Sequence, residues 1–159
     1  MNQIEKLIAH EAIAQKLYQY CYSLDEKNWS ALQACFAPEH VHNHGTYRGD
    51  RDGFLHFVKL AAERFQASHH SISNLVVELD EDNLTASSKA YFNAMHRIDG
   101  KKISEMYFFN NEIDEVDSDW LVAGIYEDRW VFRDNEWLII ERNAKHICER
   151  VEPVTPESL

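Results

Sequence analysis

The sequence contains a histidine, an aspartate and a tyrosine that could together carry out proton transfer: His70, Asp25 and Tyr20. His70 begins an alternating stretch, and a histidine paired with an aspartate can act as a general base because the carboxylate fixes its tautomer. Asp25 follows Cys21 by one helical turn, so it either meets a buried partner or lies in water. Tyr20 is either a core tyrosine or a hydrogen-bond donor to a substrate oxygen. His69 is the competing histidine and should point the other way.

Arg142 lies among apolar neighbours in the predicted last strand, so its guanidinium needs an anion. We expect either a structural partner, Asp128 or Glu141, or an oxyanion of the substrate. Polar and aromatic side chains elsewhere either belong to the core or bind substrate. The expected substrate-binding residues are Trp29, Tyr47, Phe54, Tyr91, Asn93, Tyr126 and Asp128.

His40, His42 and His44 alternate on a short extended segment and would share one face of a strand. Three imidazoles could bind a metal, but side chains on successive pleats splay apart and the segment follows directly after a helix stop. We therefore expect no metal site, and the role of this row stays open. The sequence contains no glycine-rich phosphate loop, so we expect no nucleotide or other cofactor.

Composition limits the class of protein. The 159 residues fit one domain, expected over residues 1–150, with a loose tail over 151–159. The net charge of −11 argues against nucleic acid and anionic membrane surfaces as partners. Three cysteines without a C-x-x-C spacing disfavour a disulfide framework or a thiolate zinc site. No apolar run reaches 18 residues, so we expect a cytoplasmic protein that does not span a membrane.

The hydrophobic pattern changes period near His70, from helical spacing to alternation. It predicts a helix over residues 2–24, a short second helix capped by Asn28 and a third capped by Asp50 or Asp52. The predicted extended segments are 40–47, 70–79, 84–98, 102–116, 120–132 and 137–146. Asp99–Gly100 is a strong hairpin signal. The expected fold is α+β, with a strongly bent antiparallel meander packed by three N-terminal helices into a cone and a pocket at its open end.

Alternation in the first long strand has a specific consequence for the base. It places His70, Ile72, Asn74 and Val76 on one face of the strand.

Four segments in the same order resemble one family. They are Tyr20–Asp25 followed by Trp29 and Phe36, Gly45–Gly49, His70–Asn74, and Gly124–Arg129 followed by Trp137. Together they resemble the SnoaL-like group of the nuclear-transport-factor-2-like superfamily, over about residues 5–146. The implied fold is the cystatin-like α+β barrel of that group.

The pattern looks most similar to scytalone dehydratase, bile-acid 7α-dehydratase and hexachlorocyclohexane dehydrochlorinase, which use an Asp–His pair without metal or cofactor. The resemblance implies that Asp25 and His70 form this pair and that Tyr20 and Arg142 assist it. This chain departs from those enzymes at two positions. The dehydrochlorinase has a lysine where this chain has Tyr20. The bile-acid enzyme has a second catalytic aspartate near the position that Asn93 takes in this chain.

The resemblance implies a dehydratase or isomerase that abstracts a proton from a small hydrophobic, aromatic or polycyclic ligand carrying a polar group. It also implies a homo-oligomer, a dimer or trimer. The alternatives are a non-catalytic ligand-binding domain, a partner protein like the dioxygenase β subunit, and a relative of the epoxide hydrolases or cyclases.

Overall fold

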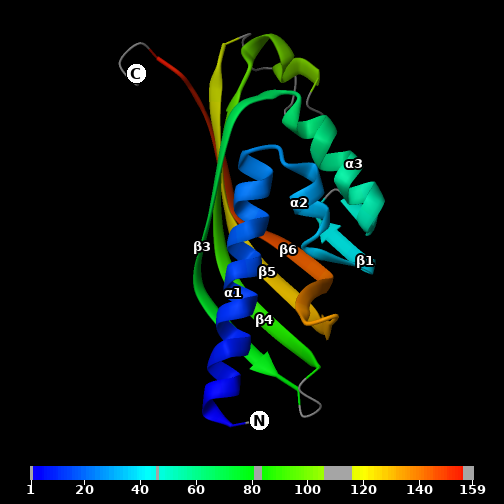
Figure 1. Cartoon of the computed structure of the whole chain (residues 1–159). Coiled ribbons are helices and arrows are strands. Elements are labelled where there is room, and N and C mark those ends of the chain that lie inside the picture. The colour runs from blue at the N-terminus through cyan, green and yellow to red at the C-terminus, as the bar shows by residue number, and fades with distance from the viewer. Residues whose placement is uncertain (1, 46, 81–83, 106–115, 156–159) are drawn as a thin grey trace.

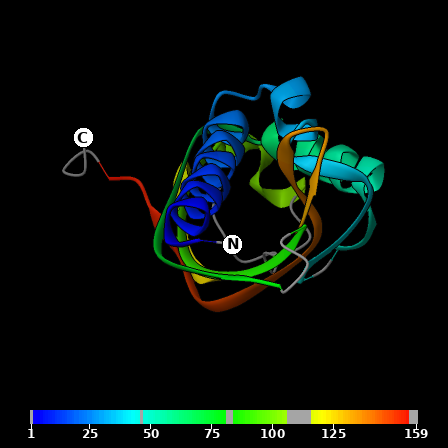
Figure 2. The ribbon, with the colours of Figure 1, turned by 60° about the horizontal axis from the view of Figure 1, so that its bottom comes forward.

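Three helices lie against the concave side of one curved sheet (Figures 1 and 2). The structure is a computed structural model that describes residues 2–45, 47–80, 84–105 and 116–155. The helices are α1 (Gln3–Asp25), α2 (Trp29–Gln33) and α3 (Arg51–Ala62). The strands are β1 (Phe36–His44), β2 (Tyr47–Asp50), β3 (Phe65–Leu79), β4 (Thr85–Ile98), β5 (Ser118–Arg133) and β6 (Glu136–Pro153). This arrangement confirms the predicted α+β cone.

Side-chain caps define where the three helices begin. The Asn2 side chain accepts a hydrogen bond from the backbone N–H of Glu5, whose carboxylate accepts from the backbone N–H of Asn2. Asn28 caps α2, and Asp50 caps α3 by accepting from the backbone of Gly53, as two of the sequence predictions required. The buried face of α1, which includes Ile13, Leu17 and Tyr20, packs into the sheet.

The strand order is β2-β1-β6-β5-β4-β3, and one pair departs from the expected meander. β1 runs parallel to β6, with His42 beside Arg142, whereas the other neighbouring strands are antiparallel. The predicted segment 40–47 is in fact two strands, separated at Gly45, whose φ of 58° suits glycine. The first strand, β1, therefore lies beside the last strand, β6.

Three further predictions fail near the ends of strands. The Asp99–Gly100 hairpin is absent, because a 3₁₀ helix covers Gly100–Glu105 and β4 pairs directly with β5. The predicted strand 102–116 is thus wrong over 102–105, and its residues 106–115 lie outside the described chain. The expected tail begins too early, since residues 151–153 still pair with β5.

A bulge in β3 shifts the inward alternation. Asn74 adopts a φ of 53°, and the pairing with β4 slips between Ser73 and Val76. Asn74 and Val76 are therefore exposed, while Leu75 is partly buried and packs against the core, which corrects the predicted single face. His70 lies before the bulge and keeps its inward direction.

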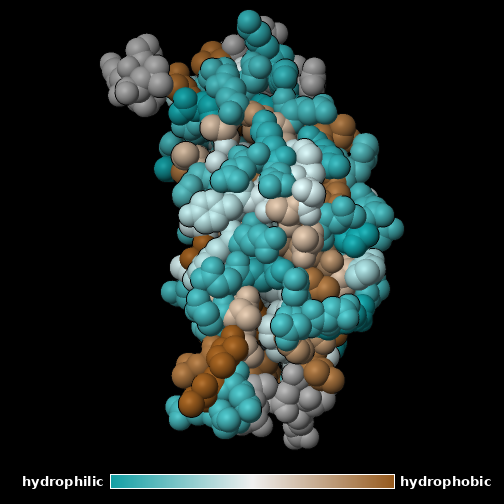
Figure 3. All heavy atoms as spheres, viewed as in Figure 1, coloured by the Kyte–Doolittle hydropathy of each residue, from teal (hydrophilic) through white to brown (hydrophobic). Residues whose placement is uncertain are grey.

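The surface seen in Figure 3 is mostly hydrophilic, with an apolar patch where α1 begins. Ile4, Leu7 and Ile8 are the exposed apolar residues of that part of the helix. No helix among the described residues is long and apolar enough to cross a membrane.

Candidate active site

A cavity of about 210 Å³ lies where the C-terminal half of α1, the helices α2 and α3, and the inner face of the sheet meet. Its walls are mostly aromatic and aliphatic, and include Trp29, Phe54 and Trp120. Four histidines reach it from four different strands: His44, His70, His96 and His146. The cavity thus combines an apolar wall with a small set of polar groups, as small-molecule sites do.

Asp25 and His70 meet at the edge of this cavity. Oδ1 of Asp25 lies 2.6 Å from Nδ1 of His70, and Oδ2 accepts the backbone N–H of His70 at 2.9 Å. The side chains are 17% and 9% exposed, so the pair is shielded but accessible. A carboxylate only accepts, so Nδ1 carries the proton and the lone pair of Nε2 is free to act as a base. The geometry is that of an oriented general base.

His96 is a second imidazole beside the pair that the sequence analysis missed. Its ring centre lies 5.1 Å from that of His70, and its Nδ1 lies 2.9 Å from Oγ of Ser68. Burial, with smaller contributions from His70 and His44, keeps the pKa of His96 well below its usual value, so the ring is neutral. Alternation along β4 with Ala94 and Ile98 was the signal that could have found it.

Tyr20 and Tyr126 present two phenols to the cavity. Both are buried, and burial raises both pKa values, so both hydroxyls stay protonated. The hydroxyl of Tyr126 donates to that of Tyr20, which leaves the O–H of Tyr20 able to donate to another acceptor. The guanidinium of Arg142 packs over the two rings, 4.2 Å from the centre of Tyr20 and 4.1 Å from that of Tyr126. The predicted donor position of Tyr20 is consistent with this placement.

Arg142 itself does not line the cavity. Asp128 binds it through two hydrogen bonds of 2.7 Å each, and both side chains are almost completely buried. Neither Arg142 nor Asp128 is among the lining residues, so the expectation that they contact substrate in this cavity is wrong. Asp128 is the structural partner that was one of the two expectations for Arg142. The guanidinium of Arg142 thus lies behind the rings of Tyr20 and Tyr126.

Replacing Asp128 with alanine should destabilise the fold by about 3–5 kcal/mol, because it leaves a buried guanidinium without its counter-ion. Urea unfolding followed by tryptophan fluorescence measures this loss. The matched control is Glu39→Ala, which removes the partner of Arg133 from an exposed pair with the same 2.7 Å contact and should cost no more than about 1 kcal/mol. Equal losses in the two variants would contradict the assignment.

The other predicted substrate-binding residues fall into three groups. Trp29, Phe54 and Tyr126 line the cavity. Tyr47 stacks on Phe57 behind the wall, 5.3 Å between ring centres, and is not among the lining residues. Tyr91 and Asn93 are exposed on the outer face of the sheet, because the intervening residues of β4 point inward; their expected role at this cavity is wrong.

In the row of histidines on β1, His40 and His42 are buried and are joined by one hydrogen bond. Nδ1 of His40 lies 3.1 Å from the carbonyl oxygen of Ile139, so this nitrogen donates. Nε2 of His40 lies 3.0 Å from Nδ1 of His42, which must then be the donor of that bond. Burial lowers the pKa of His40 to about 3 and keeps His42 well below its usual value. Among the described residues, no three histidine, cysteine or carboxylate side chains converge as a metal site requires.

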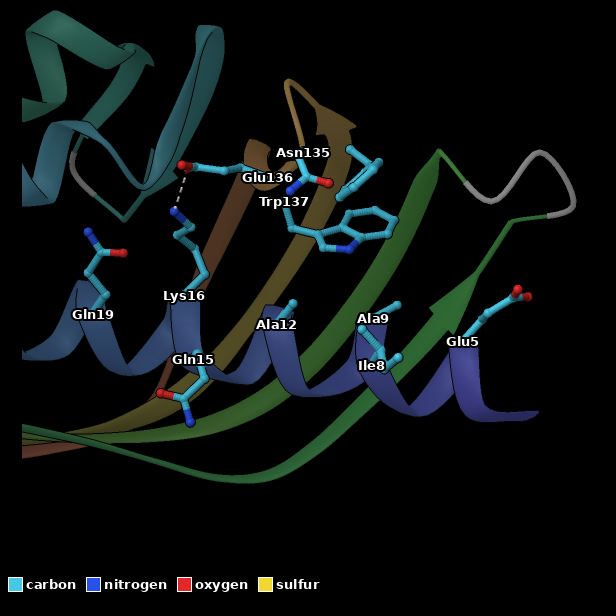
Figure 4. A pocket seen from close by; sticks show the side chains of 11 residues that line it. Glu5, Ile8, Ala9, Ala12, Gln15, Lys16, Gln19, Asn135, Glu136 and Trp137 are labelled. Carbon is cyan, nitrogen blue, oxygen red and sulfur yellow. Dashed lines mark hydrogen bonds and ion pairs between the residues drawn. The ribbon is translucent and has the colours of Figure 1, made fainter. Parts of the chain in front are cut away.

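A larger hollow of about 970 Å³ lies between α1 and the turn that joins β5 to β6 (Figure 4). The ion pair of Lys16 and Glu136, 3.1 Å long, closes one side of it, and Trp137 forms part of its floor. None of the four cavity histidines reaches this hollow. We therefore place the candidate site in the smaller cavity, which His70 of the Asp25–His70 pair lines.

The chain is thus an α+β domain whose curved sheet surrounds an apolar cavity lined by one member of an Asp–His pair. Residues 5–143 match the SnoaL-like domain family, and the chain belongs to this family within the nuclear-transport-factor-2-like superfamily. No curated protein sequence matches the chain.

Solved structures show the same fold. A proposed scytalone dehydratase from Novosphingobium aromaticivorans superposes with a TM-score of 0.77 at 18% identity, over 97% of this chain and 94% of the other. A type 2 hexachlorocyclohexane dehydrochlorinase gives 0.76 at 13% identity, over 98% and 95%. A protein with a cystatin-like fold from Nostoc punctiforme gives 0.65 at 14% identity, over 99% and 98%. At these identities the likeness concerns the fold.

Proposed function

We propose that the protein is a cofactor-independent enzyme of the lyase or isomerase type, in which His70 removes a proton from a carbon atom of a small hydrophobic substrate. The observation that carries this proposal is the 2.6 Å contact of Asp25 with Nδ1 of His70 at the edge of an apolar cavity. The names of the dehydratase and dehydrochlorinase among the similar structures agree with this reaction class.

The proposed step breaks a C–H bond next to a carbonyl or a leaving group. The proton passes to Nε2 of His70, and the electron pair of the C–H bond forms a double bond as the leaving group departs or as negative charge moves to the carbonyl oxygen. Asp25 stabilises the imidazolium, and a hydroxyl of Tyr20 donates to the developing negative oxygen. Proton return to another carbon would complete an isomerisation.

Exchange of hydrogen for deuterium tests this step without knowledge of the natural substrate. Cyclohexanone in D₂O should exchange its acidic C–H protons faster with the protein than in buffer, as followed by NMR. His70→Gln should slow the catalysed exchange about 10²- to 10⁴-fold, because the base is lost. The matched control is His69→Gln, which changes an exposed neighbour on the outer face and should leave the rate unchanged.

Equal rates for His70→Gln and the unchanged protein would contradict the proposal. Binding of the ketone without any catalysed exchange would instead favour the ligand-binding domain that the sequence analysis kept as its alternative. Tyr91 and Met95 are exposed on the outer face of the sheet, which supports the expected homo-oligomer.

A further inference from the structure

His44 and His146 form a second polar group in the cavity, separate from the general base. Their ring centres lie 5.3 Å apart with the planes almost perpendicular, and Nδ1 of His146 faces the Glu149 carboxylate at 3.7 Å. His44 is on β1 and His146 on β6, whereas His70 and His96 are on β3 and β4. Because β5 lies between β6 and β4, the backbones of those two strands are about 10 Å apart.

The tautomer of His44 follows from its surroundings. Nδ1 is buried and has no hydrogen-bond partner in the described part of the chain. An unpartnered lone pair costs less than an unpartnered N–H, so the proton belongs on Nε2. The residue as a whole is only partly shielded and lines the cavity, so the edge of the ring away from Nδ1 reaches the open space. Burial lowers the pKa of His44 to about 3, so the ring is neutral.

We propose that His44 determines substrate specificity by donating from Nε2 to an oxygen atom at the far end of a single-ring substrate whose reacting carbon lies at His70. The substrate class rests on the proposed function, which places the reacting carbon beside that base. The class is a six-membered ring with a carbonyl group and a second oxygen across the ring.

The volume of the cavity limits the ligand to one ring. A dry cavity of 150 Å³ in another protein binds benzene, and about 30 Å³ holds one water in the liquid. The space of about 210 Å³ here is therefore that of a substituted single ring. This is narrower than the aromatic or polycyclic compounds that the sequence resemblance allowed.

Binding measurements with two ketones test the role of His44. Trp29 and Trp120 line the cavity, so quenching of tryptophan fluorescence reports the ligand. The protein should bind 4-hydroxycyclohexanone about 3- to 10-fold more tightly than cyclohexanone, the effect of one additional hydrogen bond. In His44→Phe this ratio should fall to about 1. His44→Gln, which keeps an N–H near the position of Nε2, should retain part of the preference.

Equal affinities for the two ketones in the unchanged protein, or an unchanged ratio in His44→Phe, would overturn the proposal. 2-Decalone, a two-ring ketone, should bind at least about tenfold more weakly than cyclohexanone, and tighter binding would overturn the size limit. All readouts are affinities, so they stand apart from the deuterium exchange that tests the proposed function.

Discussion

Asp25→Asn should slow ketone deuterium exchange about 10²- to 10⁴-fold while leaving the fold intact. The amide oxygen of asparagine can still accept the backbone N–H of His70, which the Oδ2 atom of Asp25 accepts now. Its amide nitrogen would then donate to Nδ1 of His70, which moves the imidazole proton to Nε2 and removes the lone pair that acts as the base. The exchange rate therefore falls because His70 takes the wrong tautomer, while the contacts of the fold remain.

The rate is measured by NMR in D₂O, and urea unfolding of the variant shows whether the fold is retained. Asp52→Asn is the matched control, because it makes the same chemical change on an exposed carboxylate in the first turn of α3. An Asp25→Asn protein that exchanges within threefold of the unchanged protein would exclude the proposed role of the carboxylate.

The protein should lose stability steeply below about pH 6.5, the usual pKa of an exposed histidine. Burial lowers the folded-state pKa of four histidines: His40, His42, His44 and His96. The unfolded chain therefore binds more protons than the folded chain between about pH 6.5 and pH 3. Their contribution is fully present above pH 6.5 and falls with pH, by up to about 1.4 kcal/mol per pH unit for each histidine.

Urea unfolding at pH 7.5 and pH 5 measures this loss, which should approach the whole stability of a typical domain, about 5–15 kcal/mol. His42→Phe keeps the aromatic stack on Phe54 and removes one titrating group, so it should reduce the pH slope by about 1.4 kcal/mol per unit. His56→Gln on the exposed side of α3 is the control. A free energy of unfolding that does not change between these two pH values would contradict the neutral state of these four histidines.

The sequence was sufficient for the parts of the fold that local chemistry determines. Asn28 and Asp50 cap their helices because their side chains accept from nearby backbone N–H groups. Asp25 and His70 meet as the family resemblance implied. These features depend on short segments or on a spacing that several related folds share.

The missed features depend on contacts between distant segments. The sequence around Asn74 has the pattern of a regular strand, and the bulge there is visible only in the pairing of β3 with β4. Asp99–Gly100 has the composition of a hairpin turn, but the backbone N–H of Gly100 donates to the carboxylate of Asp117 and so belongs to a different connection. Arg142 has several possible anions in the sequence, and only the register of β5 with β6 selects Asp128.

Asp25 holds the main chain of β3 and the ring of His70 with the same carboxylate. The orientation of the base is therefore set by the junction of α1 and β3, whereas His44, Phe54 and Phe57, which shape the opposite wall, belong to β1 and α3. Substitutions in these wall residues can therefore change the shape of the cavity without touching the contacts that hold the Asp25–His70 pair.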